Sequence, residues 1–178
     1  MNISKIILFL LMPFICISCH PKWVASLKEK GKMQPIKKAY KLSRKPFVYS
    51  NLIDTNAVYI NELELVNTDG SNPHIYYRFI RFSGNGLVRS QILFDKPTES
   101  DFNSGQICFY HVEGSSIKLE KYNHDLEDFE YWYGRINEDG IYFAKRKKRE
   151  LFGGIVWEKA LYRKHEANFT QPIVFPGK

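Results

Sequence analysis

The sequence predicts an all-β protein, in which an antiparallel up-and-down meander of roughly eight strands closes as a barrel. From residue 46 onward, aromatic and β-branched residues are frequent, and turn signals containing Gly, Asn or Asp recur at short intervals. No segment beyond residue 46 needs a helix longer than one or two turns. Closure as a barrel leaves no exposed strand edge, and a β-sandwich of the same strands is the alternative.

Three predicted hairpins share one pattern, in which two arms flank a four-residue turn that contains glycine. Their first arms, turns and second arms are 74–82, 83–86 and 87–94; 106–112, 113–116 and 117–122; and 129–136, 137–140 and 141–145. A strand at about 56–66 precedes the hairpins, and a last strand at 155–163 follows them. These segments account for the meander.

Alternation along the strands predicts which side chains share a half-buried face. The residues expected to share such faces are Val88, Ile92 and Phe94; Ile117 and Leu119; and Ile155, Trp157 and Leu161. Arg89 and Glu158 lie on the opposite faces of their strands. Arg78 and Arg81 are three residues apart, so only one of them can point inward.

The order and spacing of the predicted strands and turns resemble those of small lipocalin-like, calycin-type domains of bacterial lipoproteins. The similarity lies in the run Tyr-Arg-Phe at 77–79, before a glycine turn, and in Asp-Gly-Ile-Tyr at 139–142, before the next strand. It covers roughly residues 50–163 and implies a barrel. The Gly-x-Trp sequence that opens true lipocalins is absent, which keeps the sandwich as a competitor.

Residues 1–18 have the organisation of a secretory signal peptide. Lys5 supplies the positive charge, and residues 6–15 form an apolar run that is shorter than the about 20 residues of a membrane-spanning helix. The run ends in Cys16-Ile17-Ser18-Cys19, which resembles the lipobox of bacterial lipoproteins, with Cys16 in place of the usual leucine. The alternatives are an ordinary secretory signal with an incidental cysteine, and an N-terminal helix that stays attached.

The lipobox resemblance implies that the chain is cut before Cys19 and that the Cys19 thiol carries diacylglycerol. It therefore implies a lipoprotein of the bacterial cell envelope, held in the membrane by acyl chains such as palmitate. His20 follows the cysteine, where some bacteria use an acidic residue to retain lipoproteins at the inner membrane. The resemblance thus favours the outer membrane, on its periplasmic side.

Charge divides the mature chain into a basic tether at 19–45 and a β domain at 46–178. The tether carries nine Lys and Arg residues against Glu29, whereas the β domain carries 16 basic and 18 acidic residues. Such a tether either lies along anionic head groups or is a solvated linker. Nucleic acid is not an expected partner. Cys108 is then the one cysteine without an assigned role, and we expect a small buried strand residue.

The sequence offers two groups of candidate binding residues. Aromatic side chains on predicted strands could line a pocket for a small apolar ligand inside the barrel, and the selected set is Tyr77, Phe79, Phe109, Tyr131, Tyr133 and Trp157. The cationic run Lys145, Arg146, Lys147, Lys148 and Arg149 precedes the last strand and could contact an anionic partner, or it could be a solvated loop tip.

No catalytic, metal or cofactor motif stands out. His111 and Glu113 lie two apart and share a strand face, a pairing that is common by chance. The acidic residues of 125–130 match no calcium motif. We therefore expect no enzyme activity, no metal and no cofactor. The expected function is a membrane-tethered binding module for a small apolar ligand, and the alternative is a non-catalytic accessory subunit that binds another envelope protein.

Lipidation at Cys19 can be tested directly. We expect the unaltered protein to incorporate radioactive palmitate and to fractionate with membranes, and Cys19→Ala to do neither, because the thiol is the acylated group. Cys16→Ala is the matched control and should still be labelled. An unaltered protein that takes up no label and stays soluble would contradict the lipoprotein assignment.

Overall fold

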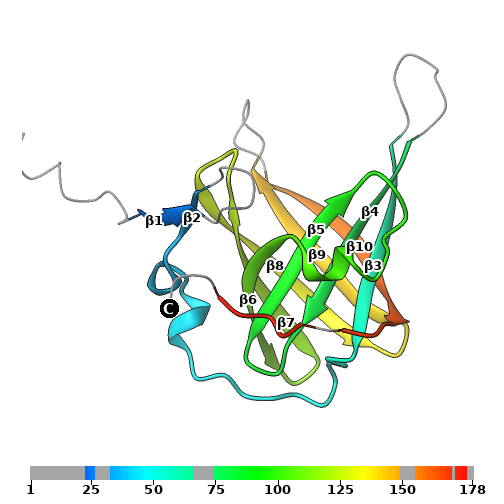
Figure 1. The fold of residues 1–178 in the computed structure, drawn as a ribbon, viewed down its shortest axis with the longest axis horizontal. Helices are drawn as coiled ribbons and strands as arrows, with labels where there is room; N and C mark the ends of the chain where they lie inside the picture. Colours follow the sequence, from blue (N-terminus) through cyan, green and yellow to red (C-terminus); the bar gives the residue numbers. More distant parts are fainter. Residues whose placement is uncertain (1–22, 27–32, 66–73, 149–154, 170, 176–178) are drawn as a thin grey trace, which may run out of the picture.

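The computed structural model describes residues 23–26, 33–65, 74–148, 155–169 and 171–175. Eight antiparallel strands form a closed barrel (Figure 1). They are β3 (Ala57–Leu65), β4 (His74–Phe82), β5 (Leu87–Leu93), β6 (Gln106–Glu113), β7 (Ser116–Asn123), β8 (Asp128–Asn137), β9 (Gly140–Lys148) and β10 (Ile155–Glu166). Each strand pairs with the next along the chain, and β10 pairs with β3. The predicted meander and its barrel closure are confirmed, and the sandwich is excluded.

Shorter elements flank the barrel. The strands β1 (Trp23–Ser26) and β2 (Met33–Pro35) pair as a separate ribbon. Three 3₁₀ turns are η1 (Lys37–Ala39), η2 (Leu42–Arg44) and η3 (Asp101–Asn103). Among the described residues, no helix has the length and apolar character needed to cross a bilayer.

The three predicted hairpins are β4–β5, β6–β7 and β8–β9. Glycine is required most clearly at Gly140, at the start of β9. Its φ of 138° lies in the region that side chains disfavour, and a Cβ there would approach the Tyr162 carbonyl oxygen to 2.1 Å. The absence of a side chain at Gly140 therefore also allows the close approach of β9 to β10 at Tyr162.

The barrel interior is packed with apolar side chains that come from all eight strands. Its buried members are Ala57 and Tyr59 (β3), Ile80 and Phe82 (β4), Val88 (β5), Cys108, Tyr110 and Val112 (β6), Ile117 and Leu119 (β7), Trp132 (β8), Ile141 and Phe143 (β9), and Tyr162 (β10), together with Ile53. Phe47 packs against this cluster, with its ring 5.5 Å from that of Tyr110. The stretch around Phe47 and Ile53 thus covers one end of the barrel, which we call the closed end. The other end, where β3 ends and β4 begins, is the far end; residues 66–73 and 149–154, which connect strands there, lie outside the described residues.

Two predicted faces need correction. In β10, Ala160 and Tyr162 face the interior, because they pair with Phe143 and Ile141, and Leu161 is only partly buried on the other side. The bulky Tyr162 ring, 5.5 Å from Phe143, decides the inward face. Along β5 Val88 is buried in the core, but the later members of its predicted face are not, because Ile92 is 46% and Phe94 76% exposed.

The N-terminal segment, residues 36–56, packs against the outside of the barrel, although the sequence assigns residues up to 45 to a tether. Tyr40 and Leu42 are buried there in a second apolar cluster with Phe109 on β6 and Tyr122 on β7. The apolar side chains between the basic residues drive this packing. The folded body therefore begins before Pro46.

Glu120 on β7 fixes this segment. Its side chain is 0% exposed and points out of the barrel, since the neighbouring Leu119 points in. The carboxylate accepts hydrogen bonds from the backbone N–H groups of Lys41 (2.8 Å) and Leu42 (2.6 Å) and from the Tyr131 hydroxyl (2.9 Å). It satisfies backbone donors at the start of η2 that would otherwise be buried without partners.

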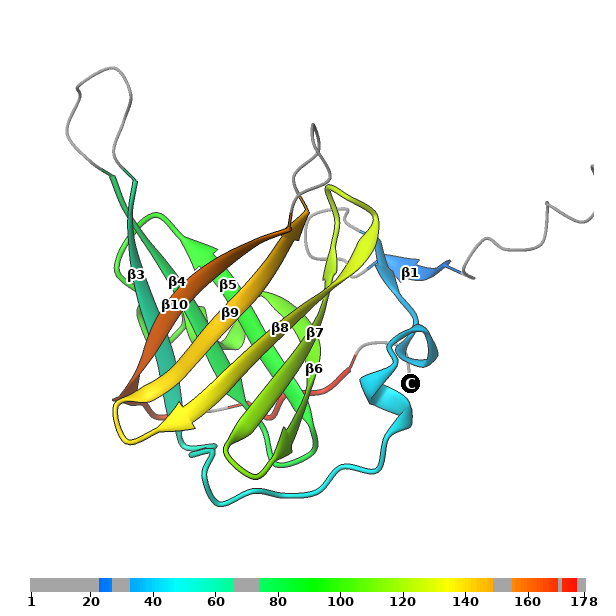
Figure 2. The same cartoon turned by 180° about the vertical axis from the view of Figure 1, so that it is seen from behind.

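The described part of the C-terminal tail, 167–169 and 171–175, crosses the outer face of the barrel, in front of the strands in Figure 1 and behind them in Figure 2. Arg81 on β4 holds it by donating to the Gln171 carbonyl, and its guanidinium stacks 3.9 Å from the centre of the Phe169 ring. Arg81 also donates to Asn103 Oδ1 at 2.8 Å, and burial lowers the pKa of its guanidinium. Arg81 is therefore the outward arginine of β4.

Replacing Glu120 should loosen the N-terminal segment. We expect Glu120→Gln to lower the free energy of unfolding by about 1–3 kcal/mol, because the amide cannot accept all three hydrogen bonds and leaves a buried donor unpaired. Urea unfolding followed by tryptophan fluorescence measures this. The exposed Glu62→Gln is the control, with an expected change within about 0.5 kcal/mol. Equal losses in both variants would contradict the role of Glu120.

Candidate functional site

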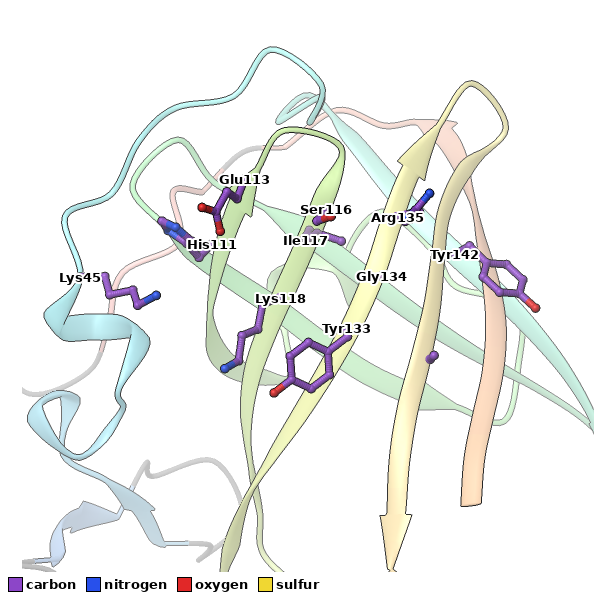
Figure 3. A pocket seen from close by; sticks show the side chains of 11 residues that line it. Lys45, His111, Glu113, Ser116, Ile117, Lys118, Tyr133, Gly134, Arg135 and Tyr142 are labelled. Atoms are coloured by element: carbon purple, nitrogen blue, oxygen red, sulfur yellow. The ribbon is translucent and has the colours of Figure 1, made fainter. Parts of the chain in front are cut away.

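A groove of about 440 Å³ lies on the outer face of β6–β9 (Figure 3). We call it the outer groove. It is lined by Lys45, His111, Glu113, Ser116, Ile117, Lys118, Tyr133, Gly134, Arg135, Tyr142 and Ala144. Most of these side chains point away from the barrel interior, and Lys45 comes from the N-terminal segment. The packed N-terminal segment thus supplies one edge of the groove.

Tyrosine rings and cations alternate along the groove. Lys118 on β7 pairs with Tyr133 on β8, and its Nζ lies 5.1 Å from the centre of the Tyr133 ring and 4.4 Å from that of Tyr131. Arg135 pairs with Tyr142 on β9. Tyr133 and Tyr142 each remain 43% exposed. Cation–π contacts hold Lys118 against the rings and leave ring surface open to a partner.

Two small residues, Ala144 and Gly134, belong to the lining of the groove. Ala144 on β9 lies opposite Tyr133, where a larger side chain would fill the space between the tyrosines. Next to Tyr133, Gly134 contributes no side chain, and a Cβ there would meet the Phe143 ring at 2.8 Å. The close approach of β8 to the Phe143 ring therefore needs glycine at this position, next to the exposed tyrosine.

His111 and Glu113 line the same edge of the outer groove, as their spacing on β6 predicts (Figure 3). Neither belongs to a larger set of ligating side chains. Among the described residues, no three His, Cys, Asp or Glu side chains come together as a group that could hold a metal ion.

Five of the six predicted ligand-lining aromatics have described side chains, and these five do not lie inside the barrel. Phe79 packs on the outside with Val58 and Phe102, and Phe109 packs on the outside with Tyr40. The others follow the same alternation: Tyr77 shares the outward face of Phe79 on β4, and Tyr131 and Tyr133 lie outside on β8. The side chain of Trp157 lies outside the described residues.

The sequence did not reveal which face of these strands points inward, because aromatic residues occupy both faces. Either set of alternate residues is apolar enough to form the interior. Of the five members of the selected set whose side chains are described, only Tyr133 lines the outer groove. A ligand role for the others stays a prediction.

The cationic run 145–149 is placed only in part. Its first four residues continue β9, which ends at Lys148, so they do not form a loop. Their side chains, and the whole of Arg149, lie outside the described residues. Contact between this run and an anionic partner stays a prediction.

The structure also reveals polar groups inside the barrel that the sequence did not single out as a site. Asn61, Arg78 and Ser90 lie on the inward faces of β3, β4 and β5, next to the apolar core. Each has a buried polar atom without a hydrogen-bond partner, namely Asn61 Oδ1, Arg78 Nε and Ser90 Oγ. The signal in the sequence was the opposition of Arg78 and Arg81 on one strand, which required one arginine to point inward.

Comparisons of the chain with protein-family models, with curated proteins and with solved structures found no match. Function must therefore be argued from the side chains themselves.

Cys108 is a buried free cysteine in the barrel core, as expected from the sequence. Burial raises the pKa of its thiol from 9.0 to about 12. The folded state therefore holds this proton above pH 9, where the unfolded state has begun to release it. It follows that stability is unaffected below about pH 8 and falls as the pH rises from 9 toward 12.

We therefore expect iodoacetamide at about pH 8 to leave Cys108 unmodified in the folded protein and to alkylate it in urea, because the thiolate is the reacting species. Peptide-resolved mass spectrometry measures the labelling. In urea melts, Cys108→Ala should lose less stability between pH 8 and 10 than the parent protein does. Rapid labelling of the folded protein would disprove the burial.

Proposed function

We propose that this chain is a lipid-anchored, non-catalytic accessory protein of the bacterial envelope, and that its outer groove binds an acidic segment of another envelope protein. The observation that carries the proposal is the composition of the outer groove. Lys45, Lys118 and Arg135 meet there against the single carboxylate of Glu113, beside two half-exposed tyrosines.

The chemistry of the groove suits a flexible acidic peptide. Carboxylates of a partner can pair with the three cations, and Arg135 can engage one of them in a bidentate manner. Tyr133 and Tyr142 offer rigid rings that bury area at little cost in conformational entropy, which is why tyrosine is frequent at protein interfaces. Electrostatic attraction would also speed the encounter.

The position of the groove is compatible with a membrane anchor. The sequence places the lipid at Cys19, outside the described residues, and the N-terminal segment that follows bears Lys37, Lys38, Lys41 and Arg44. These cations favour a location near anionic head groups. Lys45 links this segment to the groove, so a partner bound there would also lie near the membrane.

The other expectation, a small apolar ligand within a lipocalin-like barrel, has less support. The eight-stranded antiparallel barrel is consistent with that resemblance. The interior from the closed end upward, however, is occupied by apolar side chains from every strand. Such packing leaves the outer face as the better-supported contact surface.

Charge reversal in the outer groove tests the proposal in the native host. The lipidated protein would be purified in mild detergent, and stoichiometric partners would be quantified by mass spectrometry. We expect Lys118→Glu combined with Arg135→Glu to reduce the co-purified partner by about tenfold, because repulsion replaces attraction at two contacts.

The matched control is Lys96→Glu combined with Arg163→Glu, which reverses two exposed charges outside the groove and should leave the partner unchanged. Binding that the groove variant leaves intact would overturn the proposal. A co-purified lipid with no stoichiometric protein would overturn it as well.

A further inference from the structure

The N-terminal segment turns cationic side chains to the solvent with no acidic residue among them. No Asp or Glu lies between Glu29 and Asp54, a stretch that holds seven Lys and Arg residues. Lys37 and Lys38 on η1 and Arg44 on η2 are all exposed. We call these three residues the basic turn. They give this part of the surface a local excess of positive charge.

Hydrogen bonds fix the backbone of the basic turn. Arg44 donates to the Lys38 carbonyl from Nε at 2.9 Å and from Nη2 at 2.7 Å. The Ser43 hydroxyl donates to the Lys37 carbonyl at 2.6 Å. The Glu120 carboxylate ties the same segment to β7. A partner of the cations therefore meets a preformed surface, which lowers the cost of ordering on binding.

Three exposed apolar side chains follow the basic turn along the chain. Val48 is 63%, Tyr49 61% and Leu52 46% exposed. Their neighbour Phe47 instead packs at the closed end of the barrel, with its ring 5.5 Å from that of Tyr110. We call Val48, Tyr49 and Leu52 the apolar tip. Grouped exposed apolar residues mark contact surfaces, and tyrosine in particular suits the interface between water and lipid.

The basic turn and the apolar tip lie on the same side of the barrel, along β6. The ring of Tyr40, next to the cations, is 4.8 Å from that of Phe109 on β6. Phe47, next to the apolar tip, contacts Tyr110, which is the following residue of β6. In both overall views the N-terminal segment lies outside the strands on this side (Figures 1 and 2). The basic turn and the apolar tip therefore form one outer edge of the molecule.

The expected lipid attachment point is close to this edge along the chain. Cys19 lies four residues before Trp23, where β1 begins, so its Cα is within about 14 Å of β1. In both views β1 lies on the same side of the barrel as η1 and η2 (Figures 1 and 2). The inference drawn here rests on the lipid anchor of the proposed function, because acyl chains at Cys19 would bring this edge to the bilayer.

Acidic residues adjoin only one end of this edge. The turn between β7 and β8, at the far end of the barrel, exposes Asp125, Glu127 and Asp128. It borders the basic turn, since Phe129 packs 5.0 Å from Tyr40. At the closed end, Asp54 is paired with Lys164 at 3.3 Å. An anionic surface would therefore repel the β7–β8 turn and favour an approach by the apolar tip.

We propose that the N-terminal segment docks on the bilayer that holds the acyl anchor. The basic turn contacts the phosphates of anionic phospholipids, and the apolar tip inserts between their head groups. An acyl anchor alone leaves the barrel free to rotate above the membrane, whereas this second contact fixes its orientation. The outer groove keeps its own cations, because Lys41 Nζ lies 5.9 Å from the centre of the Tyr131 ring and Lys45 lines the groove.

Quenching of a fluorescent label by lipids tests the docking. The lipidated protein with Val48→Cys would carry bimane on that cysteine, since Cys108 is buried. It would be reconstituted in phosphatidylcholine vesicles that contain phosphatidylglycerol and a lipid with a quencher at head-group depth. We expect quenching of the label at 48 and none at Leu126→Cys, an equally exposed aliphatic position (60%) in the acidic β7–β8 turn.

Charge reversal tests the role of the basic turn. Lys37→Glu combined with Lys38→Glu should lower the ratio of docked to undocked protein, measured from the quenched fraction, by about tenfold. Lys96→Glu combined with Arg163→Glu is the matched control and should leave it unchanged. Lys118→Glu combined with Arg135→Glu, the groove variant, should also leave it unchanged, so the groove and the docking edge are tested separately.

Four results would overturn the proposal. Protein that does not float with the vesicles would refute both the anchor and the docking, whereas floating protein without quenching at 48 would refute the docking alone. Equal quenching at 48 and 126 would contradict the orientation. Quenching that persists without phosphatidylglycerol, or after reversal of Lys37 and Lys38, would exclude anionic lipid as the partner. A stoichiometric protein lost from the same reversal would identify a protein interface instead. Should Val48→Cys fail to fold, Leu52→Cys places the label on the same edge.

Discussion

A buried carboxylate on the outside of the barrel organises much of this structure. Glu120 takes two backbone donors from the N-terminal segment and one from Tyr131, at a position where water is excluded. Its burial is tolerable only because three donors converge on it. Burial and the bond to Glu120 raise the pKa of the Tyr131 phenol, which keeps that hydroxyl a donor. The segment held in this way also supplies Lys45 at the edge of the outer groove. The geometry of the groove therefore depends on the hydrogen bonds that Glu120 accepts from Lys41 and Leu42.

The sequence was informative about strands and turns, and much less so about faces. The hairpin turns were recognisable because glycine at their tips has a steric cause that acts locally, as at Gly140. The inward face of each strand was not recognisable in the sequence. Phe79 and Ile80, for example, are both apolar and both fully buried, but Phe79 packs outside the barrel and Ile80 within it. Only the closure of the sheet decides which alternate residues face inward. The packing of Tyr40 against Phe109 was equally hidden, since it joins residues far apart in the chain across a segment that reads as basic linker.

The outer groove and the polar groups inside the barrel differ in their exposure to water, and therefore in the strength of their polar interactions. The outer groove combines solvent-exposed charge with ring surface, so its interactions are screened by salt and suited to a partner that comes and goes. Inside the barrel, Asn61, Arg78 and Ser90 each hold one polar atom away from water, where each hydrogen bond is stronger and each unmet one more costly. Sequence motifs reached only fragments of these groups, such as the His111–Glu113 spacing, because most of their residues come from neighbouring strands and share no spacing along the chain. Lys118 and Tyr133, for example, meet only through the register of β7 and β8.

The closure of the barrel has a consequence for how the protein is made. β3 and β10 pair through residues such as Ala57 and Glu166, so the first and last strands of the sheet are neighbours. The ring of strands cannot be completed on a nascent chain until β10 has emerged, and the tail that follows must then settle over Phe102 and Tyr40. Until that moment β3 and β9 each present an unpaired edge. The fold therefore has a late, all-or-none closing step, and the chain is most vulnerable to aggregation until β10 is available to pair with β3 and β9.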